Sequence, residues 1–218
     1  MTQDLKVLDL ALRVGGRLLL GPLSFVVTPE RPTTIMGPSG CGKSSLLAWL
    51  CGTLPPDIAA SGAAMIGGQV LDELPPERRR LGIMFQDDLL FPHMTVAENL
   101  AFALPAEIRG DARRDSFAAA LAEAGLAGFA HRDPMTLSGG QRARVALLRV
   151  MLSKPRALLL DEPFNKLDFE LKARFRNLVF ESARSSGLPV LMVSHDPGDA
   201  EAAGGPVIEL RSEFDGNI

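Results

Sequence analysis

A glycine-rich segment constrains the fold of this chain more than any other part of its sequence. Residues 37–44 read Gly-Pro-Ser-Gly-Cys-Gly-Lys-Ser and fill every fixed position of the phosphate-loop pattern G-x-x-x-x-G-K-[ST]. An apolar run at residues 33–36 precedes the segment, and helix formers follow over residues 44–50. This order predicts a strand, a turn and a helix, the context in which the pattern binds polyphosphates. An ordinary glycine-rich turn before a helix is the weaker alternative.

The chemistry of such a loop follows from its residue types. Glycine tolerates positive φ, so successive backbone N–H groups can turn toward one ligand, and the helix N-terminus adds partial positive charge. Lys43 is predicted to reach the β and γ phosphates of ATP, and the Ser44 hydroxyl to ligate Mg2+. The predicted nucleotide contacts of this segment are Gly37, Pro38, Ser39, Gly40, Cys41, Gly42, Lys43, Ser44 and Ser45.

A second motif places two carboxylates at the end of an apolar run. Residues 157–163 read Ala-Leu-Leu-Leu-Asp-Glu-Pro. Alone this pattern is weak evidence, because acidic residues often end strands. Ligands of open parallel sheets bind at the carboxyl ends of the strands, so Asp161 is predicted to approach hydrated Mg2+ opposite Ser44. Glu162 is then the candidate that polarises the attacking water.

The third motif indicates a family. Residues 137–141 read Leu-Ser-Gly-Gly-Gln, with Ser138 as a good N-cap and two glycines that leave backbone N–H groups bare for a phosphate. Alone the segment could be a capped turn, but it lies between the phosphate loop and the two carboxylates. The ordered set resembles the ATPase subunits of ATP-binding-cassette (ABC) transporters, and is unlike kinases or small GTPases. Short bacterial importer subunits of the thiamine, iron and polyamine type are the most similar.

The resemblance implies roles for three further residues. Gln86 matches the Q-loop glutamine, which senses Mg2+, water and the membrane partner, and we count it among the catalytic and metal-binding residues. His195 matches the switch histidine that contacts the γ-phosphate, and Asp168 matches the D-loop aspartate at the dimer interface. Without the resemblance, these would be a surface glutamine, a strand-end histidine and a helix N-cap.

One position departs from the family pattern. The family usually offers an aromatic residue upstream of the phosphate loop that stacks on adenine, but residues 12–16 read Leu-Arg-Val-Gly-Gly and the chain has no tyrosine. We expect an apolar contact from Val14 instead, with weaker discrimination between bases.

The resemblance also implies a mechanism and partners. Two subunits pack head to tail in an ATP-dependent homodimer, so that one phosphate loop faces Ser138, Gly140 and Gln141 of the other subunit. Glu162 acts as general base, while Lys43, Mg2+ and His195 stabilise charge on the transferring phosphoryl group. Integral membrane permease subunits, and through them an extracytoplasmic solute-binding protein, are the expected partners.

Composition limits the classes of protein that remain. A chain of 218 residues with 46% hydrophobic residues can bury a core, and a net charge of −3 argues against nucleic-acid partners. No apolar run reaches the roughly 20 residues of a membrane-spanning helix, and the amino terminus lacks a signal-peptide layout. The two cysteines, Cys41 and Cys51, indicate neither a disulfide framework nor a zinc site. We expect a cytoplasmic chain, peripheral on the inner face of the cell membrane through the permease.

The predicted fold is α/β: a P-loop NTPase (RecA-like) core with an N-terminal antiparallel β-subdomain and an inserted α-helical subdomain. Residues 1–218 form one ABC ATPase domain, with the core and β-subdomain at about 1–90 and 154–218 and the helical subdomain at about 91–153. Helical periodicity in the middle and apolar runs alternating with a helical segment from residue 157 onward support this division. Residues 77–80, Glu-Arg-Arg-Arg, are expected to be a solvated turn.

Which process the ATPase drives is left open among related machines. Residues 85–100 resemble the Q-loop region of bacterial small-solute importers, where Leu89, Leu90, Phe91 and Met94 could line a groove for a permease helix or pack in the core. An exporter, a lipoprotein-release ATPase or a cell-division envelope complex would share every catalytic motif. A translation or chromosome-maintenance cassette, and a purely structural module, are less favoured.

Overall fold

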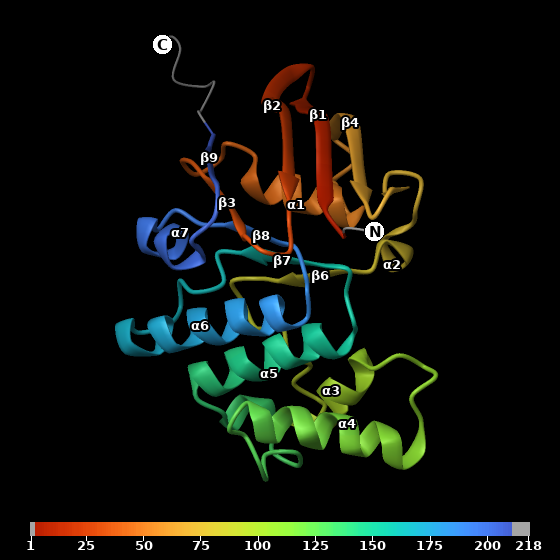
Figure 1. The fold of residues 1–218 in the computed structure, drawn as a ribbon, viewed down its shortest axis with the longest axis vertical. Helices are drawn as coiled ribbons and strands as arrows, with labels where there is room; N and C mark the ends of the chain where they lie inside the picture. The colour runs from red at the N-terminus through yellow and green to blue at the C-terminus, as the bar shows by residue number, and fades with distance from the viewer. Residues whose placement is uncertain (1–2, 211–218) are drawn as a thin grey trace.

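A computed structural model describes residues 3–210, apart from the side chain of Glu170. Two sheets form its frame (Figure 1). The first is antiparallel, has the order β2–β1–β4–β5, and consists of β1 (Leu5–Val14), β2 (Arg17–Val27), β4 (Ile58–Ile66) and β5 (Gln69–Val70). The second is parallel, has the order β6–β7–β8–β3–β9, and consists of β3 (Thr33–Met36), β6 (Leu81–Met84), β7 (Ala157–Asp161), β8 (Val190–Val193) and β9 (Val207–Glu209).

Helices cover both faces of the parallel sheet. Helix α1 (Lys43–Cys51) lies between the two sheets, whereas α5 (Gly139–Leu152) and α6 (Phe169–Ser185) cover the opposite face (Figure 1). Successive strand residues point to opposite faces, so Leu159 packs in the cluster that contains α1 while Leu158 and Leu160 pack against α5 and α6. Burial on both faces explains why β7 and β8 are continuous apolar runs.

The remaining helices build a lobe and short connections. Helices α3 (Val96–Ala103) and α4 (Gly110–Glu123) pack with α5 around a separate apolar cluster that includes Leu100, Leu121 and Val145. The short helices are α2 (Pro76–Arg79), the 3-10 turn η1 (Pro134–Thr136) and α7 (Pro197–Ala203). Within residues 3–210, none of the helices combines the length and the apolar character that crossing a bilayer would need. The predicted α/β fold class, with its antiparallel sheet and its parallel core covered by helices, is confirmed.

The topology brings the predicted site to one edge of the parallel sheet. Strands β3, β8 and β7 are neighbours and run in the same direction. Their carboxyl ends lead into the phosphate loop, the segment around His195, and Asp161–Glu162, respectively. Three motifs that are far apart in sequence therefore meet at the edge where parallel sheets bind ligands.

Arg79 corrects one expectation. The Glu-Arg-Arg-Arg segment was expected to be solvated, yet Arg79 is only 7% exposed. Its guanidinium donates to the backbone oxygens of Trp49 and Leu50 at 2.8 and 2.9 Å, and to that of Leu74 at 2.9 Å. These oxygens include the last carbonyls of α1, which lack partners within the helix, so a cation there is favourable. Arg79 thus anchors the helix that follows the phosphate loop.

Candidate functional site

The phosphate loop depends on backbone conformations that favour glycine. Gly40 has φ 82° and Gly42, the N-cap of α1, has φ 91°, both in the left-handed region. A Cβ on Gly42 would also lie 3.1 Å from the Cβ of Leu20. The N–H of Leu46 already donates to the Gly42 oxygen at 2.9 Å. The loop therefore leads directly into α1, whose first N–H groups lack partners within the helix.

A cavity of about 260 Å³ opens at this loop. Lys43 is 7% exposed, and its ammonium donates to the backbone oxygens of Gly37 and Pro38, both at 2.7 Å. The Cys41 side chain is buried with its Sγ 4.0 Å from the same ammonium, which leaves the backbone of this residue for ligand contact. The lining combines glycines, hydroxyls, one cation and one carboxylate, the groups that a polyphosphate site needs; it consists of Leu19, Ser39, Gly40, Gly42, Lys43, Ser44, Ser45 and Glu162.

Two oxygen ligands at the cavity fit a magnesium ion. The Ser44 hydroxyl donates to Asp161 Oδ1 at 3.4 Å, and Asp161 ends β7. Burial raises the pKa of Asp161, and the nearby Glu162 charge acts in the same direction, while the hydrogen bond from Ser44 opposes the shift. A carboxylate that is costly to ionise without a cation, facing a hydroxyl, suits a hard divalent ion. Ser44 and Asp161 would hold Mg2+ here.

Gln86 lies two residues beyond β6, the strand that pairs with β7. Its side chain is exposed. Its predicted contacts with Mg2+ and water stay predictions.

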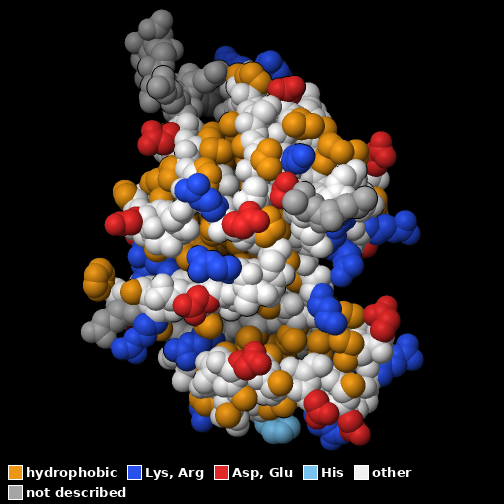
Figure 2. Space-filling view, in the orientation of Figure 1, with side chains coloured by type: hydrophobic (Ala, Val, Ile, Leu, Met, Phe, Trp, Pro, Cys, Tyr) orange, Lys and Arg blue, Asp and Glu red, His pale blue; other side chains and the backbone are white. Residues whose placement is uncertain are grey.

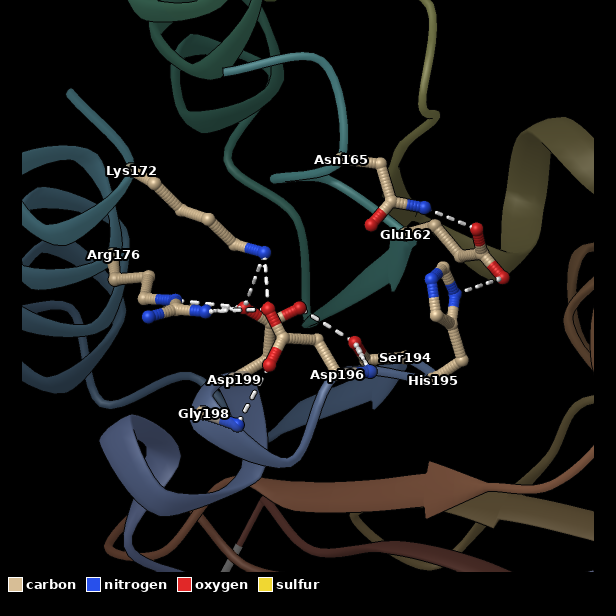
Figure 3. Close-up of polar contacts among 9 residues, drawn as sticks. All are labelled: Glu162, Asn165, Lys172, Arg176, Ser194, His195, Asp196, Gly198 and Asp199. Atoms are coloured by element: carbon tan, nitrogen blue, oxygen red, sulfur yellow. Dashed lines mark hydrogen bonds and ion pairs between the residues drawn. The ribbon is translucent and has the colours of Figure 1, made fainter. Parts of the chain in front are cut away.

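The structure brings Glu162 and His195 together (Figure 3). The Glu162 backbone has φ 49°, an unusual value for a side chain of this size, and its N–H donates to the Val193 oxygen at 2.9 Å. Its Oε1 lies 3.3 Å from His195 Nδ1. Strained backbone of this kind gathers at functional sites because surrounding bonds must hold it.

Asn165 is a residue of the site that sequence reasoning missed. Its side-chain amide donates to Glu162 Oε2, so the carboxylate is held between Asn165 and His195 (Figure 3). The contact arises because residues 162–165 form a tight turn, in which the Asn165 N–H also faces the Glu162 oxygen at 3.4 Å. An amide three residues after the carboxylate, just past a strand end, was the available signal.

Residues 137–141, Leu-Ser-Gly-Gly-Gln, which we call the signature segment, lie apart from the phosphate cavity and lead into α5, the signature helix. Ser138 caps α5: its Oγ accepts from the Gln141 N–H at 3.3 Å, and Gln141 Oε1 accepts from the Ser138 N–H at 2.9 Å. A Cβ on Gly140 would clash with the Leu171 side chain of α6, so close packing favours a glycine at this position. None of the residues that line the phosphate cavity comes from this segment.

A second hollow, of about 530 Å³, adjoins the phosphate cavity and shares Leu19 and Gly40 with it. Val14, predicted to contact adenine, lines this hollow and is 40% exposed. Arg17 also lines it and was not among the predicted residues.

Asp168, predicted to lie at the dimer interface, caps α6, with Oδ1 accepting from the Leu171 N–H at 2.9 Å.

Fold and site together define a phosphate-loop nucleotide-binding domain with a capped signature helix. Residues 20–165 match the family model described as ABC transporter. The chain is 48% identical over 196 residues to the "Uncharacterized ABC transporter ATP-binding protein YnjD" of Escherichia coli (strain K12), with 90% of both chains covered. It therefore belongs to the ABC transporter family and is an ATPase of the ABC type.

Two further comparisons agree. The chain is 38% identical over 201 residues to the "Fe(3+) ions import ATP-binding protein FbpC" of Streptomyces avermitilis, covering 92% of this chain and 57% of that protein. It thus spans little more than half the length of this iron-import relative. The solved "Dimeric structure of a post-hydrolysis state of the ATP-binding cassette MJ0796 bound to ADP and Pi" matches with a TM-score of 0.77 and 28% identity, over 96% of each chain.

Proposed function

We propose that this ATPase is the nucleotide-hydrolysing subunit of a membrane transporter that imports a small solute. The observation that carries the proposal is an apolar groove next to the Q-loop, described below. The similarity to an iron-import ATP-binding protein supports import.

The groove has a volume of about 480 Å³ and lies between β6, α3 and the end of α5. Three of its hydrophobic residues are well exposed: Phe85 at 41%, Leu89 at 54% and Phe102 at 65%. Figure 2 shows hydrophobic side chains gathered at the junction of the central layers with the lobe of α3 and α4. Of the groove residues predicted from sequence, Leu89 and Phe91 line it; Leu90 packs against the core clusters, and Met94 is not in the lining.

An exposed apolar groove of this kind suits an amphipathic helix from a partner. The residues that line it include Phe85, which precedes Gln86, so a docked permease helix would touch the segment that leads to the proposed Mg2+ site. Arg149 ties this segment to α5 by donating to the Leu89 oxygen at 2.8 Å. A permease helix in the groove would therefore contact both the Q-loop and the signature helix. We also propose that residues 91–153, the lobe built by α3, α4 and α5, form the helical subdomain that moves together with the permease.

The proposed mechanism assigns one task to each residue at the edge. Lys43 and the backbone N–H groups of the loop bind the phosphates, and Ser44 and Asp161 hold Mg2+, which supplies charge neutralisation when bound. Glu162 accepts the proton of the attacking water. His195 donates a hydrogen bond to the transferring phosphoryl group. Gln86 contacts the bound Mg2+ and water and so couples nucleotide binding to the groove.

The second subunit completes the site in this proposal. Because Ser138, Gly140 and Gln141 do not line their own phosphate cavity, we propose that they face the nucleotide of a partner copy in a head-to-tail, ATP-dependent homodimer. The solved relative, itself dimeric and bound to ADP and Pi, supports this arrangement. The dimer would sit on the inner face of the membrane through the permease, which in turn would receive solute from an extracytoplasmic binding protein.

We further propose that the hollow beside Val14 receives adenine. Val14 and Leu19 offer apolar contact, and the Arg17 guanidinium could stack on the base in place of the missing aromatic ring.

The test is Mg2+-dependent ATP hydrolysis by the purified chain, compared with Glu162→Gln. We expect the variant to lose about a hundredfold or more of the activity, the range measured for removed general bases. It should still bind ATP, and ATP should shift it to a dimer in size-exclusion chromatography. Hydrolysis by Glu162→Gln at the wild-type rate would refute the assignment of the base.

A second experiment tests the groove. A Phe85→Ser and Leu89→Ser double variant should keep basal hydrolysis and lose stimulation by the reconstituted permease.

A further inference from the structure

Four charged side chains, one of them completely buried and three partly buried, lie beside the segment that carries His195 (Figure 3). Lys172 and Arg176 come from α6, while Asp196 and Asp199 come from the start of α7. Asp199 is completely buried, its Oδ1 accepting from Arg176 Nε at 2.7 Å with Lys172 Nζ at 3.4 Å. Asp196 pairs with the same two cations. Two cations balance two carboxylates, and this balance allows the Asp199 carboxylate to be fully buried.

The Ser194 hydroxyl joins this network to the backbone around His195. Ser194 is completely buried, and its Oγ donates to Asp199 Oδ2 at 2.5 Å and accepts from the Asp196 N–H at 3.1 Å. The Ser194 N–H donates to the Ile35 oxygen of β3 at 3.2 Å. One hydroxyl therefore ties both neighbours of His195 to a buried carboxylate.

The same network reaches the turn that carries Glu162. That turn continues through Asp168 into α6, and the two cations lie within the first turns of this helix. Helix α6 thus connects the two segments whose side chains meet at Glu162 Oε1 and His195 Nδ1, 3.3 Å apart. No member of the network lines the phosphate cavity.

We propose that Ser194, Asp199 and Arg176 are positioning residues that set the placement of His195 relative to Glu162 for hydrolysis. The inference rests on the proposed function of those two side chains. It predicts an effect on kcat and not on ATP binding, because the network acts through His195 and stays outside the cavity. A network that only joins α6 to α7 would instead affect stability and leave kcat unchanged.

The test begins with Ser194→Ala. We expect kcat to fall by about ten- to a hundredfold, as misplacement of a reacting group does, while KM for ATP stays within about twofold. Ser194→Thr keeps the hydroxyl and should recover most of kcat. The matched control is Thr34→Val on the neighbouring strand, because the Thr34 hydroxyl is also buried but has no hydrogen-bond partner. Its kcat should equal that of the wild type.

A second variant covers the case in which Ser194→Ala does not fold. Arg176→Lys keeps the charge but loses the paired hydrogen bonds to Asp199, so it should show the same selective fall in kcat. Circular dichroism and Tm establish that each variant is folded. A folded Ser194→Ala or, in its place, a folded Arg176→Lys with wild-type kcat overturns the inference, as does an equal loss in Thr34→Val. Glu162→Gln is assayed alongside, and activity retained there would refute the proposed function instead.

Discussion

The phosphate loop and the His195 segment meet at one edge of the parallel sheet, yet different forces hold them. The phosphate loop is shaped by backbone, through left-handed glycines and a lysine bonded to the loop's own carbonyls. The His195 segment is shaped by side chains, through one hydroxyl and a network of charged side chains from α6 and the start of α7. A loop of the first kind fails when a single Cβ is added, whereas one of the second kind depends on several elements staying in place.

The difference also separates the tasks of the two segments. Backbone N–H groups present the same donors whatever the protonation state of nearby side chains, which suits tight binding of a fixed polyphosphate. Side-chain networks can rearrange when one helix moves. Because α6 belongs to the His195 network and packs against α5, we expect a movement of α5 to act on the His195 segment through α6.

The largest effect should come from adding one carbon to the phosphate loop. Gly42→Ala forces an L side chain into the left-handed region at φ 91° and brings its Cβ to 3.1 Å from Leu20. We expect ATP hydrolysis to fall by about a hundredfold, since the loop must move. Gly187→Ala is the control, because Gly187 also has positive φ but its Cβ would meet nothing within 4 Å. Equal activity in the two variants would show that the loop is not held by its backbone.

A smaller effect on ATP hydrolysis is expected from removing the amide that holds the Glu162 carboxylate. Asn165→Ala removes the amide that holds Glu162 Oε2, so kcat should fall by about tenfold through loss of orientation. The affinity for ATP, measured by direct titration, should be unchanged because Asn165 does not line the phosphate cavity. A fall in affinity as large as the fall in kcat would contradict a positioning role.

The smallest effect concerns stability and has opposite signs at two carboxylates: Asp161, which faces Ser44 of the phosphate loop, and Asp196, in the His195 segment. Burial raises the pKa of Asp161, so its ionisation destabilises the fold as pH rises through the folded pKa. The hydrogen bond from Lys172 lowers the pKa of Asp196 from 3.8, so this residue stabilises the fold above that value, and the contribution is lost as pH falls through the folded pKa.

Thermal unfolding without nucleotide or Mg2+ measures both signs. At neutral pH, Asp161→Asn should raise Tm and Asp196→Asn should lower it, each by a few degrees, since about 1 kcal/mol corresponds to ~2–4 °C at this size. The deficit of Asp196→Asn should shrink below pH 4, roughly where the unfolded carboxyl protonates. Shifts of Tm with the same sign in the two variants would contradict this contrast between the two carboxylates.

The difference between backbone and side-chain control also decides how much of the structure could be predicted from the sequence. The phosphate loop is local: residues 37–44 determine its backbone, so the pattern predicted the strand, the loop and the helix that follows. The alternation of apolar runs and helical segments predicted the α/β fold class, because burial on both faces of a parallel sheet leaves a readable pattern. The capped signature helix was also predictable from Ser138 and Gln141.

What escaped prediction depends on partners distant in sequence. Arg79 looked like part of a solvated turn, since its acceptors at Trp49 and Leu50 lie about thirty residues away. The partners of Lys172 and Arg176 could not be predicted, because only the folded chain places the carboxylates at the start of α7 against them. Exposure of the groove likewise depends on how α3 and β6 meet, so the apolar residues 89–94 could equally have been core.

The two hydrogen bonds of Lys43 to its own loop have a thermodynamic consequence. Most of the conformational entropy of this long side chain is already lost before any phosphate arrives, and the ammonium is largely removed from water. Binding then exchanges carbonyl acceptors for phosphate oxygens, and little new ordering is required of the protein. We therefore expect a polyphosphate to bind to an ammonium that is already in place, by replacing its backbone acceptors, without ordering of the loop around the ligand.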